Sequence, residues 1–409
     1  PAPGLADAWR ADAPAELYEQ ERIHRWQNDP AHDLRLPYYG FEEVHLTMMH
    51  ADGAHGHYGR WLEARHPDAR GLVGPAHAHS PAQITALQAW RTAVPEELYS
   101  TSYIGEQAVQ FLRRHGAQQR ERPFFLQVSF NDPHHPFTPP GKYWDMYDPA
   151  DVALPRSFAA HDENAPPTLK HLLAERDEGR SNRDSWMLQA VTEKDVREAI
   201  ALTYGSITMI DDAIGRVLQT LEELGLAGNT VLVFTSDHGD YMGDHQLMFK
   251  GPMHYDGLIR VPFIWSDPQL DCRGAASDAL AGTLDIAATI LQRAGLAPFH
   301  GMQGRDLTAV MRGEDAGRDA MLIEEDNQRA FLGFDQPVRL RTLVTDRWRL
   351  SVYRGVAWGE LYDLQEDPLE MRNLWNDAAL RGVRAELLLQ LVQTMEDLAD
   401  DSPLPTARA

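Results

Sequence analysis

The run Asn229-Thr-Val-Leu-Val-Phe-Thr-Ser-Asp-His-Gly239 joins a largely apolar segment of strand length to an abrupt polar end. The segment before it, from Glu193, has apolar residues at intervals of three and four, which indicates a helix, in one piece or two, that stops near Gly225 and Gly228. An earlier run, Pro123-Phe-Phe-Leu-Gln-Val-Ser-Phe130, is apolar on both faces, as a buried parallel strand should be. The order strand, helix, strand therefore predicts an α/β fold with a mostly parallel sheet and helices on both faces.

Neighbouring segments fit the same architecture. Helical periodicity covers Glu97–His115 and Thr283–Ala294, and Gly295 closes the second of these. The short apolar run Val261–Trp265 predicts a further strand. Asp148–Thr192, by contrast, mixes proline, aspartate and asparagine without periodicity, which indicates a long surface excursion of the kind that often forms lids or binding loops.

After Arg312 the pattern changes to short strands. Val338–Val344 and Trp348–Tyr353 are typical of an antiparallel pair, and Glu360-Leu-Tyr-Asp363 follows them. A helical pattern then runs from Leu380 to Leu398. The sequence therefore predicts a smaller C-terminal unit of antiparallel sheet and helix.

The length of the chain supports two packed units. Its 409 residues, 43% of them hydrophobic, exceed the ~250–300 residues at which single cores stop growing. We expect an α/β domain over residues 1–312, incomplete at its N-terminal side, and an α+β subdomain over residues 313–409.

Charge and composition exclude several classes of partner. The formal net charge of -23 repels polyanions, so we expect no nucleic-acid partner. The apolar runs are much shorter than the ~20 residues of a membrane-spanning helix, so we expect a soluble protein without a membrane partner. Cys272 is the single cysteine, and the start at Pro1 has no signal-like core. The compartment, cytoplasmic or periplasmic, therefore stays open.

Asp237 and His238 lie where the carboxyl end of a strand is expected, the edge of a sheet where ligands gather. A carboxylate and an imidazole side by side, followed by Gly239 in a tight turn, can both face a cation. Alternatively, Asp237 caps the next turn and His238 makes a local hydrogen bond. In isolation, Asp-His-Gly favours this local structural role.

Two further side chains can complete an anion site. Lys250 lies in a glycine-flanked loop, where an ammonium can hold a sulfate or phosphate oxygen. His134 follows the earlier apolar run and can protonate a leaving alkoxide. The alternatives are a solvated surface lysine and a loop histidine held rigid by Pro133 and Pro136.

A third histidine-rich segment fits no common metal template. It contains His45, His50, His55 and His57 within residues 44–58, without a matching set of carboxylates. We interpret these histidines as ordinary polar packing.

The motifs together resemble the sulfatase family of the alkaline phosphatase superfamily. The run Thr235-Ser-Asp-His-Gly-Asp-Tyr-Met-Gly-Asp-His-Gln-Leu-Met-Phe-Lys250, with Ile259-Arg-Val-Pro262 after it, is similar to the second half of a sulfatase active site. Pro133-His-His-Pro136 resembles the family's substrate-binding histidine motif, in which the histidine after the first proline matches. Glu360-Leu-Tyr-Asp-Leu-Gln-Glu-Asp-Pro-Leu-Glu370, with Asn373-Leu374 after it, is similar to the C-terminal signature. The resemblance covers residues 38–376, with three motifs in the expected order.

The resemblance implies a two-domain alkaline-phosphatase-like fold with one divalent cation. Asp237 and His238 would be metal ligands, while Lys250 and His134 would be catalytic residues that bind the anionic group and the leaving oxygen of a small sulfate or phosphate ester. Many sulfatases have asparagine at the second ligand position and bind calcium. His238 resembles instead the branch of phosphonate monoester and phosphodiester hydrolases, which favours manganese or zinc.

The first half of the family pattern is not found. The family has an early Asp-Asp metal pair, a C/S-x-P-x-R motif whose cysteine or serine becomes formylglycine, and a Gly-Lys-x-His strand end. Cys272 lies in Asp271-Cys-Arg-Gly274, which lacks the proline and the arginine spacing. We therefore expect the nucleophile in a missing segment, negligible turnover by this polypeptide alone, and poor solubility where apolar surface is left exposed.

Two classes of function stay open at this point. The first is a hydrolase of sulfuric esters, with phosphonate monoesters or phosphodiesters as the alternative substrates. The second is a non-catalytic relic or assembly subunit that binds but does not cleave. Self-association into a homo-oligomer is compatible with both.

Overall fold

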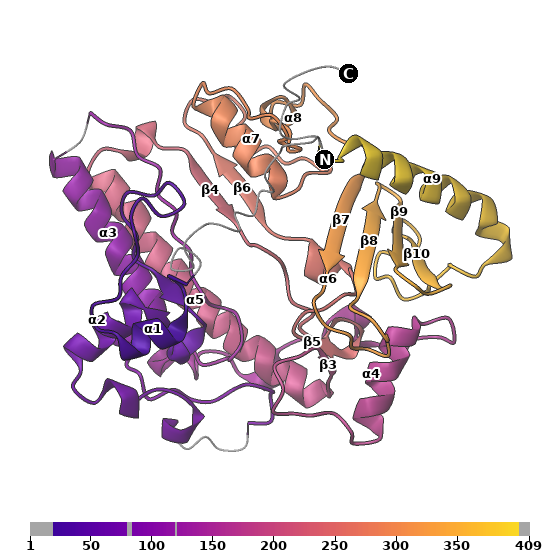
Figure 1. Cartoon of the computed structure of the whole chain (residues 1–409), viewed down its shortest axis with the longest axis horizontal. Coiled ribbons are helices and arrows are strands. Elements are labelled where there is room, and N and C mark those ends of the chain that lie inside the picture. Colours follow the sequence, from indigo (N-terminus) through magenta and orange to yellow (C-terminus); the bar gives the residue numbers. More distant parts are fainter. Residues whose placement is uncertain (1–18, 80–83, 119–120, 401–409) are drawn as a thin grey trace. The chain divides into compact units, whose positions relative to one another are not determined.

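The computed structural model describes residues 19–79, 84–118 and 121–400 (Figure 1). The chain divides into two compact units. The first unit comprises residues 1–154, 183–186 and 192–229, and the second comprises residues 155–182, 187–191 and 230–409. The boundary that we expected after residue 312 falls inside the second unit, and a division there stays a prediction.

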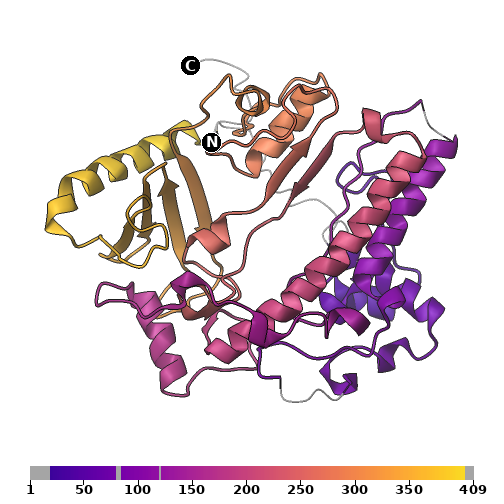
Figure 2. The same cartoon turned by 180° about the vertical axis from the view of Figure 1, so that it is seen from behind.

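The first unit is mainly helical. Its helices and short strands are α1 (Ile23–Asn28), β1 (Thr47–Met48), β2 (His55–Gly56), α2 (His57–Arg65), α3 (Ser100–Gln118) and α5 (Glu193–Glu223). Figure 2 shows α3 and α5 side by side, and they approach closely where Gly105 faces Ala213. The prediction of both long helices is confirmed, and α5 is unbroken. It begins with a capping box in which Thr192 and Asp195 bond to each other's backbone N–H groups.

The apolar run 123–130 was wrongly predicted to be a strand. Among the described residues of the first unit, no strand pairs with it. Val128 and Phe130 instead pack against a core cluster that contains Tyr58 and Ile104. The apolar pattern predicts burial, whereas a strand also requires a hydrogen-bonded neighbour, which the pattern does not specify.

Whereas the only sheet in the described part of the first unit is the short antiparallel pair of β1 and β2, the second unit carries the larger sheet. Its elements before residue 312 are α4 (Pro167–Asp177), β3 (Gln189–Ala190), β4 (Leu232–Thr235), β5 (Leu247–Met248), α6 (Asp256–Ile259), β6 (Phe263–Ser266), α7 (Leu284–Arg293) and α8 (Thr308–Met311). The expected surface excursion is thus partly regular, because it contains α4 and also β3, which pairs with β5. Proline at the first helical position of α4 is a helix-start signal that the interpretation of this segment as a loop did not use.

The direction of the strand pair β4 and β6 differs from the expected parallel arrangement. The two strands pair antiparallel, with Val233 opposite Trp265. The connection between them contains a 3-10 turn at Asp244–Gln246, β5 and the four-residue helix α6. None of these is a crossover helix, so the chain returns in the opposite direction. Apolar side chains of this pair, among them Phe234 and Ile264, are exposed.

The C-terminal part of the second unit confirms the predicted antiparallel sheet and helix. The strands β7 (Met321–Asp326), β8 (Arg339–Val344), β9 (Trp348–Tyr353) and β10 (Gly359–Asp363) form a sheet of order β10-β9-β8-β7, and α9 (Arg381–Asp397) follows. Leu387 and Leu391 of α9 pack on Leu343, Leu350 and Leu361 of the sheet. Of the elements β7 to β10 and α9, only β7 was not predicted from the sequence. No helix in the described part of the chain is long and apolar enough to span a membrane.

Candidate active site

Asp237 and His238 follow directly on β4 in a tight turn. The Asp237 carboxylate accepts the backbone N–H of His238 at 2.9 Å, and the Ser236 hydroxyl donates to the carbonyl of His238 at 3.0 Å. Gly239 then donates its N–H to the carbonyl of Leu258 at 2.7 Å. A Cβ at Gly239 would lie 1.9 Å from a backbone oxygen of α6, so only glycine fits this approach. Asp237 therefore caps the turn and His238 makes a local hydrogen bond, as expected for the local structural role. Neither contact excludes a role in the candidate site.

The ring of His238 is oriented by its own turn. Its Nδ1 lies 2.7 Å from the carbonyl oxygen of Gly239, so in the neutral ring Nδ1 carries the proton and donates it. The lone pair is then on Nε2, which lies 3.0 Å from Lys250 Nζ and 3.4 Å from an Asp237 carboxylate oxygen. A metal-binding histidine is typically held by the same kind of N–H bond to a carbonyl.

Lys250 is half-buried and lies close to two carboxylates. Burial lowers the pKa of Lys250 from its ordinary value, while the carboxylates of Asp237 and Asp240 partly oppose this shift. Burial also raises the pKa of Asp240 to about 7, although that carboxylate accepts the N–H groups of Met242 and Phe249 at 3.1 and 3.0 Å. Asp240 thus fixes the loop that carries Lys250, a role that the sequence did not reveal.

Asp237 is the most exposed member of the group. Its side chain is 83% exposed, against 37% for His238. Partial burial would raise the pKa of Asp237, but the adjacent His238, the neighbouring N–H groups and the ammonium of Lys250 outweigh it and hold the pKa below its ordinary value. The carboxylate is therefore ionised and accessible to a cation.

The donor atoms fit a divalent cation as part of its coordination shell. A carboxylate oxygen and an imidazole nitrogen suit manganese and zinc, and the orientation of the His238 ring leaves Nε2 as the donor. Within residues 19–79, 84–118 and 121–400, no three or more His, Cys, Asp or Glu side chains gather as a metal site. Asp237 and His238 therefore supply only a part of the ligands that such an ion needs.

His134 lies in the first unit, whereas the other three predicted residues lie in the second. Its ring stacks on His50 at 3.6 Å between centroids and on His135 at 4.1 Å. Asp132, two residues earlier, is buried beside the hydroxyl groups of Tyr99 and Thr101. The convergence of His134 with the other three side chains stays a prediction.

The histidine-rich segment is held by local polar contacts. His57 Nε2 lies 2.9 Å from the carboxylate of Asp33, and its Nδ1 accepts the N–H of Leu46 at 2.9 Å. His45 lies 2.9 Å from Glu43. These contacts support the interpretation as polar packing.

The fold is that of the alkaline-phosphatase-like α/β proteins. The phosphonate monoester hydrolase of Agrobacterium radiobacter has a similar structure, with a TM-score of 0.73 and 27% identity over 92% of this chain and 75% of that one. The family model named Sulfatase matches residues 45–296, which is more than half of the chain, and the model for the C-terminal part of N-sulphoglucosamine sulphohydrolase matches residues 243–397. The chain belongs to the sulfatase family.

Characterised relatives agree with this assignment. An arylsulfatase of Clostridium perfringens is 32% identical over 285 residues, which are 69% of this chain and 54% of that protein. The multifunctional alkaline phosphatase superfamily protein PehA of Trinickia caryophylli is 30% identical over 302 residues, which are 70% of this chain and 57% of that protein. The chain thus spans little more than half the length of these two relatives.

Proposed function

We propose that this chain forms part of a metal-dependent hydrolase of sulfuric esters. Asp237 and His238 would bind one divalent cation, Lys250 would bind the anionic group of the ester, and His134 would bind and protonate the leaving oxygen. Membership of the sulfatase family supports the reaction class. The roles of the individual residues are our proposal.

The observation that carries the proposal is the approach of three complementary groups to one point. His238 Nε2 has Lys250 Nζ at 3.0 Å and an Asp237 carboxylate oxygen at 3.4 Å. The carboxylate and the nitrogen lone pair suit a cation, while the half-buried ammonium suits an anionic oxygen. A cation and a sulfate group can therefore be held side by side at the end of β4.

The residues would divide the chemical work as follows. A bound cation would supply Lewis-acid stabilisation of an ester oxygen. Lys250 would complement the negative charge that develops on the transferred group, and burial strengthens this interaction. His134 would hold the proton that passes to the leaving oxygen. We propose that the nucleophile is a formylglycine from a C/S-x-P-x-R motif, which residues 1–409 do not contain.

A second candidate substrate class is supported by His238 itself. Imidazole in place of a carboxamide favours manganese or zinc over calcium. The phosphonate monoester hydrolase with a TM-score of 0.73 and the relative PehA point in the same direction. Phosphonate monoesters or phosphodiesters are therefore the alternative substrates.

Binding and turnover test the two parts of the proposal separately. Calorimetry with Mn²⁺, Zn²⁺ and Ca²⁺ should show binding that His238→Ala and Asp237→Ala abolish, and the cation should strengthen binding of an aryl sulfate or an aryl phosphonate. Equal cation binding by all variants would rule out this site. Turnover by the 409-residue polypeptide should stay near background with both esters. A rate well above background would refute the proposed origin of the nucleophile.

A further inference from the structure

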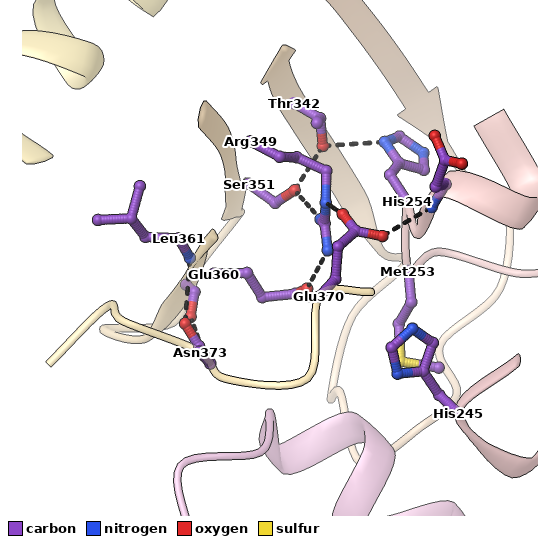
Figure 3. A network of polar contacts seen from close by, with 12 residues as sticks. His245, Met253, His254, Thr342, Arg349, Ser351, Glu360, Leu361, Glu370 and Asn373 are labelled. Atoms are coloured by element: carbon purple, nitrogen blue, oxygen red, sulfur yellow. Dashed lines mark hydrogen bonds and ion pairs between the residues drawn. The ribbon is translucent and has the colours of Figure 1, made fainter. Parts of the chain in front are cut away.

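The segment between Lys250 and α6 is held by the C-terminal sheet. The Tyr353 hydroxyl donates to the carbonyl of Pro252 at 3.0 Å. The ring of His254 is buried against β8 and β7, and its Nδ1 lies 2.9 Å from the Thr342 hydroxyl (Figure 3). Its Nε2 lies 3.2 Å from Glu325. The chain that leaves Lys250 is thus fixed on the sheet before it enters α6.

Glu370 contacts the C-terminal end of this segment, where α6 begins. One of its carboxylate oxygens accepts from Arg349 Nε, and the other accepts the backbone N–H of Asp256, the first residue of α6, at 2.7 Å. Glu370 is only 2% exposed, and its backbone has φ 54°, a left-handed conformation that residues other than glycine rarely adopt. A glutamate at such a position indicates that its carboxylate has a specific role.

Arg349 holds the Glu370 carboxylate in place. Figure 3 shows the guanidinium between Glu370 and Glu360, where it also donates to the Ser351 hydroxyl at 2.9 Å. It lies over the ring of Tyr362 at 4.5 Å. A buried, hydrogen-bonded charge network contributes little to net stability but restricts geometry strongly, because any displacement leaves a buried charge without its partner.

The helix α6 transmits this restraint to the candidate site. The carbonyl of Leu258 accepts the N–H of Gly239 at 2.7 Å, and the backbone of Gly257 lies against Gly239. The carbonyl of Gly239 in turn accepts Nδ1–H of His238. A continuous series of contacts therefore runs from Arg349 and Glu370 through α6 to the imidazole whose Nε2 faces Lys250.

We propose that Glu370 is a positioning residue that sets the geometry of His238 and Lys250 by anchoring the N-terminus of α6. Lys250 precedes the anchored segment along the chain, and the turn of His238 contacts α6 at the far end of that segment through Gly239, so the sheet of β7 to β10 sets their separation. The inference depends on the proposed function only for the roles of His238 and Lys250. The mechanical link itself is independent of turnover.

A matched pair of variants at Asp256 isolates the link. Asp256→Pro removes the N–H that Glu370 accepts, and proline is favoured at the first position of a helix, where the extended Tyr255 also suits it. Asp256→Ala keeps the N–H and removes only the exposed carboxylate. Glu370→Ala removes the anchor from the other side. Leu387→Ala, on the face of α9 that packs on the sheet, controls for a general loss of stability.

Two measurements read the link without using catalysis. Hydrogen exchange of the peptide that contains the Gly239 amide should become at least about tenfold faster in Asp256→Pro and Glu370→Ala, because opening of α6 releases this amide. The ¹⁵N signals of the His238 ring should shift in the same two variants. Asp256→Ala and Leu387→Ala should leave both measurements close to those of the unmodified protein. Asp256→Pro should also leave the exchange of the β8 and β9 hairpin peptide unchanged.

Equal exchange and ring signals in Asp256→Pro and Asp256→Ala would overturn the proposal, even if Glu370→Ala does not fold. Faster exchange of the same size in Leu387→Ala would also overturn it, because the effect would then be global. Loss of cation binding and of ester binding in every form of the protein would count against the proposed function alone. The exchange and ring measurements would still decide the role of Glu370.

Discussion

Lys250 is the residue whose charge the proposed function needs most directly. Lys250→Met keeps the length of the side chain and removes the ammonium, so we expect the affinity for an aryl sulfate to fall about tenfold to a hundredfold, the range of a hydrogen bond to a charged group. Calorimetric titration in the presence of Mn²⁺ measures the change. The control is Lys170→Met, since Lys170 donates to the backbone carbonyl of Glu163 on the surface of the same unit. Equal affinities in the two variants would remove Lys250 from the site.

Asp132 provides a pH-dependent prediction near His134. Burial raises the pKa of Asp132 to about 6, and the charge of Asp52 adds to this, while hydrogen bonds from Thr101 and Tyr99 oppose it. Because the folded pKa lies above the unfolded value, the folded state holds the extra proton. The stabilisation from this proton is complete below about pH 4 and is lost as the pH rises through 6.

Asp132→Asn should therefore gain stability relative to the unmodified protein as the pH rises from 4.5 to 7. The gain is on the order of 2–3 kcal/mol for a shift of about two pKa units. Urea unfolding at pH 4.5, 5.5 and 7 measures the difference between the two proteins. A difference that stays constant over this range would contradict the raised pKa.

The sequence revealed the parts of the candidate site that are close along the chain. Asp237, His238 and Lys250 lie in one continuous stretch, and the structure brings these three together. Glu370 was only part of a C-terminal pattern, because its partners are a backbone N–H far away in the sequence and the buried guanidinium of Arg349. No local periodicity encodes such a long-range contact.

At the scale of elements, α6 must lie directly against the turn after His238. Gly239→Ala would place a Cβ 1.9 Å from the carbonyl oxygen of Gly257, so backbone must shift. We expect a loss of about 1–3 kcal/mol or more in the free energy of unfolding, as in other overpacked sites. Gly382→Ala in α9 meets open space and should instead stabilise the helix by about 0.5–1 kcal/mol. Urea unfolding compares the two, and a neutral Gly239→Ala would exclude the close contact.

The long elements followed from the sequence, while strand pairing did not. Periodicity over many residues predicted α3 and α5, and two short strand-like runs on either side of Asp346-Arg347 predicted β8 and β9, because these patterns are local in the sequence. The run 123–130 has the same apolar character but pairs with no strand in the described part of the chain. Pairing depends on which segments meet in three dimensions, so neither this run nor the antiparallel direction of β4 and β6 could be read from residue type.

At the scale of the whole molecule, the two units are interleaved in the sequence. The chain passes between them after residues 154, 182, 186, 191 and 229. Segments as short as 183–186 and 187–191 show no change in composition that would mark a boundary between units. The change of pattern after residue 312 was the boundary that the sequence suggested. The units are defined by contacts between distant segments, which local pattern cannot supply.

The net charge of -23 predicts how the whole molecule responds to salt. Repulsion among like charges destabilises a compact state, and NaCl from about 10 mM to about 150 mM shortens the Debye length from roughly 30 to roughly 8 Å. Screening also weakens surface ion pairs, but each of these contributes only ~0–1 kcal/mol, so relief of repulsion should dominate. We therefore expect the Tm to rise with added NaCl, by roughly 1–3 °C for each kcal/mol by which the free energy of unfolding increases. Differential scanning calorimetry measures the rise, and the triple variant Glu97→Gln, Glu222→Gln and Glu314→Gln, which removes three exposed negative charges, should show a smaller one. A Tm that falls with salt would mean that specific ion pairs outweigh the repulsion.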